Sequence, residues 1–107
     1  MAVQHNDSRL DRMFFPKSVA VVGASDVPAK WGNLILTSIL GWKFGGRVFP
    51  VNPNKDTILG LKSYPSLRDI PEEVDLAVFT IPARFVPEGL RDCAAKGIKA
   101  AVIISSG

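Results

Sequence analysis

The first stretch able to do chemistry is a glycine-containing loop that follows the apolar run 19–22. Gly23 allows the backbone to turn sharply, and Ser25 offers a hydroxyl group. Backbone amides at the start of a following helix would point toward a ligand above the loop, and a phosphate group suits such donors. A simple strand-to-helix turn is the alternative for Gly23. The loop begins with Gly23, Ala24 and Ser25 and continues to Lys30, Trp31 and Gly32.

The loop lacks the fingerprints of two common nucleotide sites. A nicotinamide-dinucleotide site has the pattern G-x-G-x-x-G, followed about twenty residues later by an acidic residue that holds the ribose hydroxyls. In this chain the third position of the pattern is Ser25, and no carboxylate follows the second apolar run before Asp56. The pattern G-x-x-x-x-G-K-[ST] would need glycine where the chain has Pro28. These departures weigh against an NAD(P)-dependent oxidoreductase or a redox-sensing domain, and they favour a different phosphate-bearing ligand.

A second candidate group follows the apolar run 48–51. Asn52 supplies an amide, Pro53 a rigid ring and Lys55 a cation. Lys55 is able to pair with a phosphate that a carboxylate at this place would repel. The alternative for Lys55 is a solvated surface lysine.

A third candidate group lies at the end of the predicted strand 74–82. Ile81, Pro82 and Ala83 follow one another there. Pro82 has no amide hydrogen for a strand ladder, so it marks the strand end, and its ring offers a flat apolar wall for an adenine ring or a pantetheine arm. Arg84 either faces the same crevice or starts the next helix in solvent.

Hydrophobic periodicity indicates the elements that position these loops. The first helix is expected to be amphipathic, since its apolar residues recur every three or four positions from Trp31 to Trp42. Residues 54–73 are polar and rich in turn signals, and we expect them to form a surface crossover with only a short helix near residues 66–70. The predicted elements are, in order, strand 17–25, helix 30–44, strand 45–53, strand 74–82, helix 85–97 and strand 98–107.

Clear boundary signals accompany both helices. Gly45 or Gly46 is expected to end the first helix. Pro87 and Glu88 suit the first turn of the second helix, and Gly97 suits its end.

The single cysteine, Cys93, lies within the second predicted helix. An intrachain disulfide is therefore impossible. We expect Cys93 on the inner face of the helix as a packed residue rather than as a reactive thiol.

Apolar runs joined by crossovers predict a parallel α/β sheet, because a tight turn cannot connect parallel strands. We expect a Rossmann-like fold with helices on both faces of the sheet, in which ligands bind at the carboxyl ends of the strands. Residues 1–13 are expected to form a tail or a short helix, and residues 14–107 the domain. A loop and a helix would normally follow the last strand, so we expect a C-terminally truncated fragment of a longer protein.

The composition weighs against several classes of function. A net charge of +3 without a run of basic residues favours an anionic ligand only weakly and argues against nucleic-acid binding. No apolar run is long enough to span a membrane and no secretory signal is visible, so we expect a cytoplasmic chain without a membrane partner. His5 is the only histidine and lies in the polar tail, so no metal site is expected.

Four of these stretches together resemble a known family. They are SVAVVGAS with KWGN, GRVFPVNPNK, VDLAVFTIPARFVPE and GIKAAVIISSG, and the resemblance runs from Phe14 to Gly107. The chain resembles the N-terminal CoA-binding domain of the nucleoside-diphosphate-forming acyl-CoA synthetases, which include the α subunits of ADP-forming acetyl-CoA synthetase and of succinyl-CoA synthetase. The resemblance implies a Rossmann-like, nucleotide-binding fold that holds CoA above the strand ends.

The resemblance also implies which residues contact CoA. The first loop would surround the phosphates and the nucleotide, and the second and third groups would supply further contacts. A fourth segment lies at the end of the chain, where the thiol end of CoA approaches the reaction centre in the family. The residues implied in the second, third and fourth segments are Asn52, Pro53, Lys55, Ile81, Pro82, Ala83, Ile104, Ser105 and Ser106.

The family's ligase reaction interconverts acyl-CoA, phosphate and a nucleoside diphosphate with the free acid, CoA and the triphosphate, through an acyl phosphate and a phosphorylated histidine. That histidine belongs to a later domain, and no residue of this chain matches it. The resemblance therefore implies that the chain alone binds CoA, a substrate of the parent enzyme, without catalysing the reaction. Its expected partners are downstream synthetase domains or a nucleotide-grasp partner subunit. A small stand-alone CoA-binding protein is the alternative.

Overall fold

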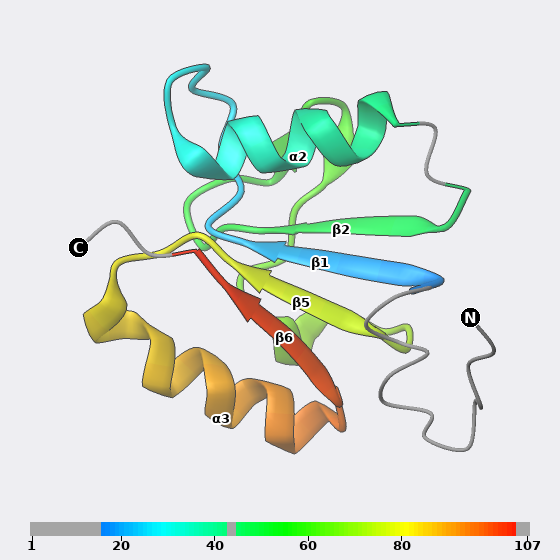
Figure 1. Cartoon of the computed structure of the whole chain (residues 1–107), viewed down its shortest axis with the longest axis vertical. Coiled ribbons are helices and arrows are strands. Elements are labelled where there is room, and N and C mark those ends of the chain that lie inside the picture. Colours follow the sequence, from blue (N-terminus) through cyan, green and yellow to red (C-terminus); the bar gives the residue numbers. More distant parts are fainter. Residues whose placement is uncertain (1–15, 43–44, 105–107) are drawn as a thin grey trace, which may run out of the picture.

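The computed structural model describes residues 16–42 and 45–104 of the chain (Figure 1). Within this part it contains six strands, two α-helices and two short 3₁₀ helices. The elements are β1 (Ser18–Val22), α2 (Trp31–Gly41), β2 (Arg47–Val51), β3 (Thr57–Ile58), β4 (Leu61–Lys62), η1 (Leu67–Asp69), β5 (Leu76–Phe79), η2 (Ala83–Phe85), α3 (Val86–Lys96) and β6 (Ala100–Ile103).

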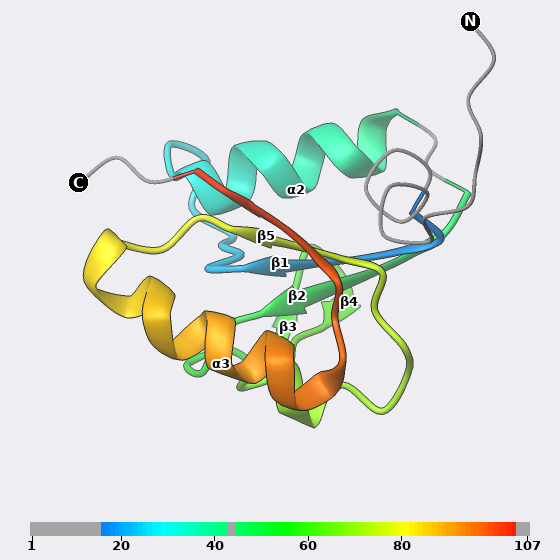
Figure 2. The same cartoon turned by 60° about the horizontal axis from the view of Figure 1, so that its bottom comes forward.

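Four parallel strands form one sheet in the order β2-β1-β5-β6. Helix α2 covers one face of this sheet and helix α3 covers the opposite face (Figure 2). The structure confirms the predicted Rossmann-like parallel sheet with helices on both faces. After β1 the chain moves to one side of the sheet, and from β5 it moves to the other side. A crevice for ligands forms at such a change of direction.

Each face of the sheet has its own hydrophobic core. Under α2, Val21 and Val78 of the sheet pack with Leu36 of the helix. Under α3, Phe79 packs with Cys93. These five side chains are at most 7% exposed. The burial of β1 and β5 on both faces, which their continuous apolar runs predict, is therefore confirmed.

The short helix predicted near residues 66–70 is confirmed as η1 (Leu67–Asp69), but the prediction that the rest of residues 54–73 forms a surface crossover is wrong. Strands β3 and β4 form an antiparallel hairpin, and Ile58, Leu67 and Ile70 are at most 2% exposed. Ile58 joins the core under α2, whereas Leu67 and Ile70 join the core under α3. The frequent turn residues of the segment conceal these few apolar residues, and their burial completes both cores.

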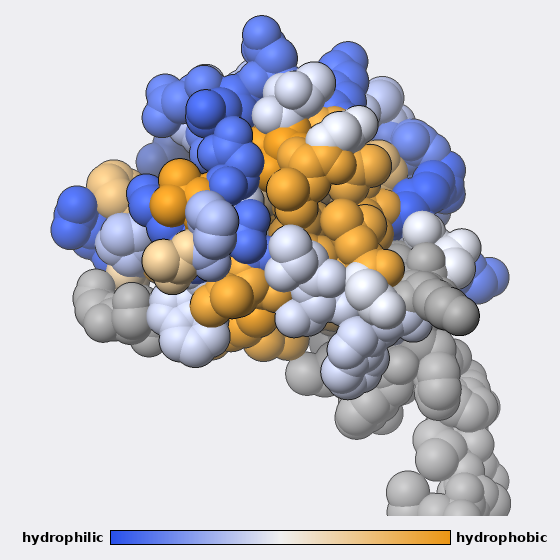
Figure 3. All heavy atoms as spheres, turned by 90° about the horizontal axis from the view of Figure 1, so that it is seen from above, coloured by the Kyte–Doolittle hydropathy of each residue, from blue (hydrophilic) through white to orange (hydrophobic). Residues whose placement is uncertain are grey.

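Helix α2 has the predicted type, but its tryptophans do not face the sheet. The helix turns Gly32 and Leu36 inward, while Trp31 is half exposed and Trp42 is 86% exposed. Figure 3 shows apolar side chains gathered on the face of the molecule that carries α2. Close packing of Gly32 on the turn after β1 fixes this rotation of the helix. The helix ends at Gly41, with Trp42 as its C-terminal cap residue, so the predicted end at Gly45 or Gly46 is wrong. Residues 43–44 lie outside the described residues.

Helix α3 confirms its predicted boundary signals. Pro87 and Glu88 lie in its first turn, and the helix ends at Gly97 in the left-handed conformation. Cys93 lies on its inner face, as predicted, and is 5% exposed. Burial raises the pKa of the Cys93 thiol from 9.0 to about 11, and the neighbouring Asp92 carboxylate adds to this rise. The folded protein therefore favours the protonated thiol.

Cys93 should make the stability of the domain depend on pH above neutrality. The pKa of the Cys93 thiol is higher in the folded protein than in the unfolded chain. Its contribution to the free energy of unfolding is therefore complete below pH 9 and is lost as the pH rises to about 11. We expect urea denaturation to show that the stability difference between the wild-type protein and Cys93→Ala narrows across this range. A difference that stays constant with pH would contradict the expectation.

The sequence predicts neither a membrane-spanning helix nor a metal site, and the structure addresses both only for the residues that it describes. Within residues 16–42 and 45–104, no helix is long and apolar enough to cross a membrane, and no cluster of three metal-ligating side chains occurs. The predictions for residues 1–13, His5, Ser105 and Ser106 fall outside the described residues.

Candidate functional site

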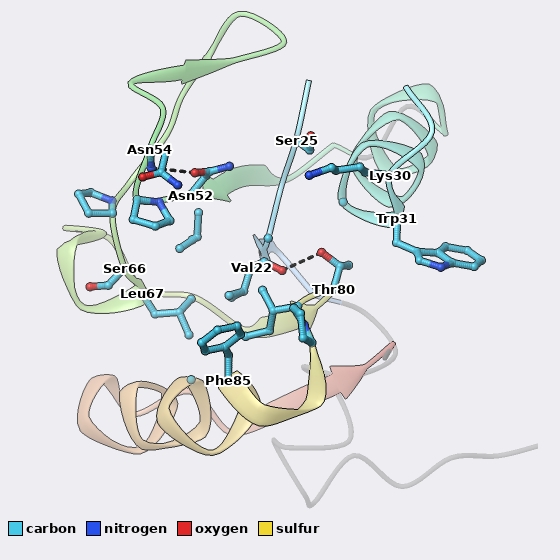
Figure 4. Close-up of a pocket in the computed structure, with 18 of the residues that line it drawn as sticks. Val22, Ser25, Lys30, Trp31, Asn52, Asn54, Ser66, Leu67, Thr80 and Phe85 are labelled. Atoms are coloured by element: carbon cyan, nitrogen blue, oxygen red, sulfur yellow. Dashed lines mark hydrogen bonds between the residues drawn. The ribbon is translucent and has the colours of Figure 1, made fainter. Parts of the chain in front are cut away.

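A cleft of about 980 Å³ lies at the carboxyl ends of β1, β2 and β5 (Figure 4). Its walls come from the segments that follow these strands, from the first turn of α2 and from the start of α3. This is where a parallel α/β sheet is expected to bind a ligand.

The first wall of the cleft is the turn after β1. Gly23 has a φ of 92°, a conformation that favours glycine. Its N–H donates to the carbonyl oxygen of Val51 at 3.0 Å, and a Cβ here would lie 2.6 Å from Oγ1 of Thr80. The turn is held between β2 and β5, so it presents backbone rather than side chains to the cleft.

The N-terminus of α2 packs directly against this turn. A Cβ on Gly32 would overlap the carbonyl oxygen of Gly23, so only glycine lets the helix approach this closely. The helix begins after Lys30, and no side chain in the described part of the protein caps it. Its first turn also lacks an acidic residue. The free amides and the positive end of the helix dipole therefore suit an anion at this end of the cleft.

Lys30 adds a formal positive charge beside these amides. Its side chain lines the cleft and extends from α2 toward Ser25 and Asn52 (Figure 4). Trp31 also lines the cleft, but its ring is directed away from the centre (Figure 4). Lys30 is therefore the side chain best placed to pair with an anionic ligand.

Ser25 holds the first loop in shape. Its hydroxyl oxygen accepts the N–H of Val27 at 3.0 Å, and its carbonyl oxygen accepts Nδ2 of Asn33 at 3.1 Å. The hydroxyl has its own hydrogen to donate to a ligand. Ser25 thus fixes the loop on α2 while it lines the cleft.

Asn52 ties the loop after β2 to the loop after β1. Its Nδ2 donates to the carbonyl oxygen of Ala24 at 3.0 Å, and its Oδ1 accepts the N–H of Asn54 at 2.8 Å. Its own N–H donates to the carbonyl oxygen of Tyr64 at 2.9 Å. Both ends of the side-chain amide are engaged, so Asn52 is a structural bridge as well as a lining residue.

The wall formed by the segment between β5 and α3 is apolar. This wall consists of Ile81, Pro82 and Phe85, and it includes the proline that was expected there. The guanidinium group of Arg84 lies 4.7 Å from the ring centroid of Phe85. Arg84 itself is outside the lining, so it contacts the cleft wall rather than the ligand space.

The side of the cleft formed by α3 carries acidic residues. Glu88 and Asp92 line it from α3. Oδ1 of Asp92 accepts Nε of Arg68 at 2.7 Å, which neutralises part of this charge. The cleft is therefore polarised, and an anionic group of a ligand is favoured at the Lys30 end.

Most of the predicted site residues come together at the cleft. They derive from three loops that are far apart in the sequence, and the parallel sheet brings them to one edge. Their contact with CoA stays a prediction. The predicted residues that line the cleft are Gly23, Ser25, Lys30, Trp31, Gly32, Asn52, Pro53, Ile81 and Pro82.

Four predicted site residues lie outside the lining of the cleft. Ala24 is fully buried, and Ile104 packs against the core under α2. Ala83 lies in the short helix η2. Lys55 pairs with Asp26, with 3.5 Å between Nζ and Oδ2. Tertiary contacts explain the positions of Ala24, Ile104 and Lys55, and the short helix η2 explains that of Ala83.

The contribution of the crossover to the cleft is absent from the sequence-based prediction. Tyr64 forms a parallel bridge with Val51, and this bridge carries the chain past the end of β2. Recurring apolar residues at 64, 67 and 70 were the available signal.

The lining residues that were not predicted, from all walls of the cleft, are Val22, Ala29, Val51, Asn54, Pro65, Ser66, Leu67, Thr80, Phe85, Glu88, Gly89 and Asp92.

Comparison with known sequences gives a family for this fold and cleft. A family described as a CoA binding domain matches residues 17–107. Acetate–CoA ligase (ADP-forming) II of Archaeoglobus fulgidus is 55% identical over 95 residues, which are 89% of this chain and 14% of the ligase. The chain thus spans a small part of the length of this relative.

Solved structures agree with the sequence comparison. Acetyl-coenzyme A synthetase 1 of Ca. Korarchaeum cryptofilum matches with a TM-score of 0.88 and 46% identity, over 92% of this chain and 21% of that chain. A conserved hypothetical protein from Pyrococcus furiosus matches with a TM-score of 0.76 and 41% identity, over 82% of this chain and 74% of that chain. The resemblance inferred from the four sequence stretches is confirmed, and the chain belongs to the CoA-binding domain family.

Proposed function

We propose that the chain binds CoA in this cleft and serves as the CoA-binding domain of an ADP-forming acyl-CoA synthetase. The polarised cleft is the observation that carries the proposal. The uncapped N-terminus of α2 and Lys30 suit the phosphates of CoA, whereas the wall of Pro82 and Phe85 suits its uncharged adenine and pantetheine parts. The similarity to an acetate–CoA ligase supports CoA over a nicotinamide dinucleotide.

The chain would bind and orient CoA and would not carry out the chemical steps. Its only histidine is His5, which lies before the fold. The domain corresponds to 14% of the Archaeoglobus ligase and 21% of the Korarchaeum synthetase. We therefore propose that further synthetase domains, or a partner subunit, bring an acyl phosphate to the CoA thiol. The thiol would attack the acyl carbon and release phosphate.

A cytoplasmic location of the chain stays a prediction.

Isothermal titration of the chain with CoA tests the binding proposal directly. We expect saturable heat with one binding site per chain, and no saturable heat with NADH. Absence of saturable heat at millimolar CoA would contradict the proposed CoA binding. Saturable binding of NADH in preference to CoA would favour the dinucleotide alternative.

Lys30→Gln should weaken CoA binding about 10-fold, because it removes a charged hydrogen-bond donor at the phosphate end of the cleft. Lys99→Gln is the matched control. Lys99 is exposed and directly precedes β6, so it lies at the other end of the sheet. Titration calorimetry of both variants measures the effect. Equal affinities for the two variants would remove Lys30 from the site.

A small stand-alone CoA-binding protein is the second candidate function. The hypothetical protein from Pyrococcus furiosus supports it, because this chain covers 74% of that solved chain. The length of the reading frame that encodes the chain separates the two candidates. A frame that continues into synthetase domains favours the first, and a frame of about this length favours the second.

A further inference from the structure

An ion pair joins two loops beside the cleft. Nζ of Lys55, in the loop after β2, lies 3.5 Å from Oδ2 of Asp26, in the loop after β1. The hydrogen bond from Asn52 to Ala24 joins the same two loops. The two side chains of the ion pair are 49% and 44% exposed. The ion pair therefore lies at the rim of the cleft, where solvent and a ligand both have access to it.

We propose that Asp26 lowers the affinity of this cleft for phosphorylated ligands, because its carboxylate holds the Lys55 ammonium that a ligand phosphate would bind. The inference rests on the proposed CoA-binding function. Lys55 is outside the lining of the cleft while it is paired, although its neighbours Pro53 and Asn54 line it. Binding of a phosphorylated ligand exchanges the carboxylate for a phosphate at Lys55.

The strength of the ion pair suits such an exchange. A half-exposed ion pair is weak, because water screens the charges and two long side chains lose freedom. A phosphate ester carries more charge than a carboxylate and has three acceptor oxygens. After the exchange, the Asp26 carboxylate stays at the rim and repels the phosphate. Asp26 therefore lowers the affinity for phosphorylated ligands by pairing with Lys55 and by repelling the phosphate. Only the first effect requires Lys55.

Asp26→Asn should tighten CoA binding about 3- to 5-fold, as expected for the loss of one competing surface ion pair. Titration calorimetry with CoA measures the change. Glu72→Gln is the matched control, because it removes the same charge and breaks the Arg47–Glu72 ion pair. Arg47 begins β2, so this pair lies at the end of the strand away from the cleft. The control should leave the affinity for CoA unchanged.

Lys55→Gln separates the exchange at Lys55 from general repulsion. With this substitution present, the gain from Asp26→Asn should fall below about 1.5-fold, because the two residues are coupled. An equal gain in both backgrounds would overturn the inference, since Asp26 would then act only through its charge. Wild-type protein that binds CoA, with no gain in Asp26→Asn, would overturn this inference alone. Wild-type protein that fails to bind CoA would overturn the proposed function and this inference together.

Discussion

Replacing Gly32 with alanine should destabilise the domain and disrupt the cleft. A Cβ at this position would overlap the carbonyl oxygen of Gly23 and lie 2.8 Å from its carbonyl carbon. These are backbone atoms that no change of rotamer moves, so the N-terminus of α2 must shift away from the turn. We expect the free energy of unfolding to fall by about 2–3 kcal/mol. Because the anion-binding amides shift with the helix, CoA binding should weaken at least about 10-fold.

Gly41→Ala in the same helix is the control for Gly32→Ala. Among the described residues, a Cβ on Gly41 would meet no atom within 4 Å beyond its chain neighbours and the backbone of its own helix. Alanine is a better helix former than glycine, so this control should gain up to about 1 kcal/mol in stability. Urea denaturation and CoA titration of both variants measure the two effects. Wild-type stability in Gly32→Ala would show that the helix has room at this turn, against the structure.

Replacing Gly89 in α3 with alanine should also destabilise the domain, although alanine normally favours a helix by about 1 kcal/mol over glycine. The new Cβ would overlap Cε1 of Phe79 and lie 3.1 Å from Cδ1. Phe79 is fully buried at the end of β5, so its ring has no free space to enter. We expect the free energy of unfolding to fall by about 1–3 kcal/mol, measured by urea denaturation.

Phe79→Leu tests whether the two residues compete for one space. The leucine side chain is shorter and leaves room for a Cβ on residue 89. The loss of unfolding free energy in the double variant Gly89→Ala/Phe79→Leu should be smaller than the sum of the losses in the two single variants, by at least about 0.5 kcal/mol. Losses that simply add would contradict the close contact between Gly89 and Phe79.

Local sequence patterns predict an element well when its burial follows from its own residues. Strand β5 is apolar along its whole length and β1 is apolar after Ser18, as suits strands that α2 and α3 cover on both faces of the sheet. The segment 54–73 is different. Ile58 and Leu67 are buried by contacts with elements distant in the sequence, and turn residues separate them. No periodicity within the segment could show which core each of them joins.

The position of the candidate site was predictable for a topological reason. The carboxyl ends of neighbouring parallel strands meet at one edge of the sheet, so the loops after β1, β2 and β5 must lie together. The contacts between those loops were not predictable. The pairing of Lys55 with Asp26 and the bridge from Asn52 to Ala24 depend on distances of a few ångströms between loops. Residue types alone do not determine such distances.

The two tryptophans of the chain stand at opposite ends of α2. Trp31 lines the cleft, whereas Trp42 is 86% exposed. Indole fluorescence depends on the polarity of its surroundings, so a change of emission on ligand binding would come from Trp31, which lines the cleft, and not from the solvated ring of Trp42. A Trp42→Phe protein would therefore keep one tryptophan, beside the cleft, as a reporter of ligand binding, with no dye attached.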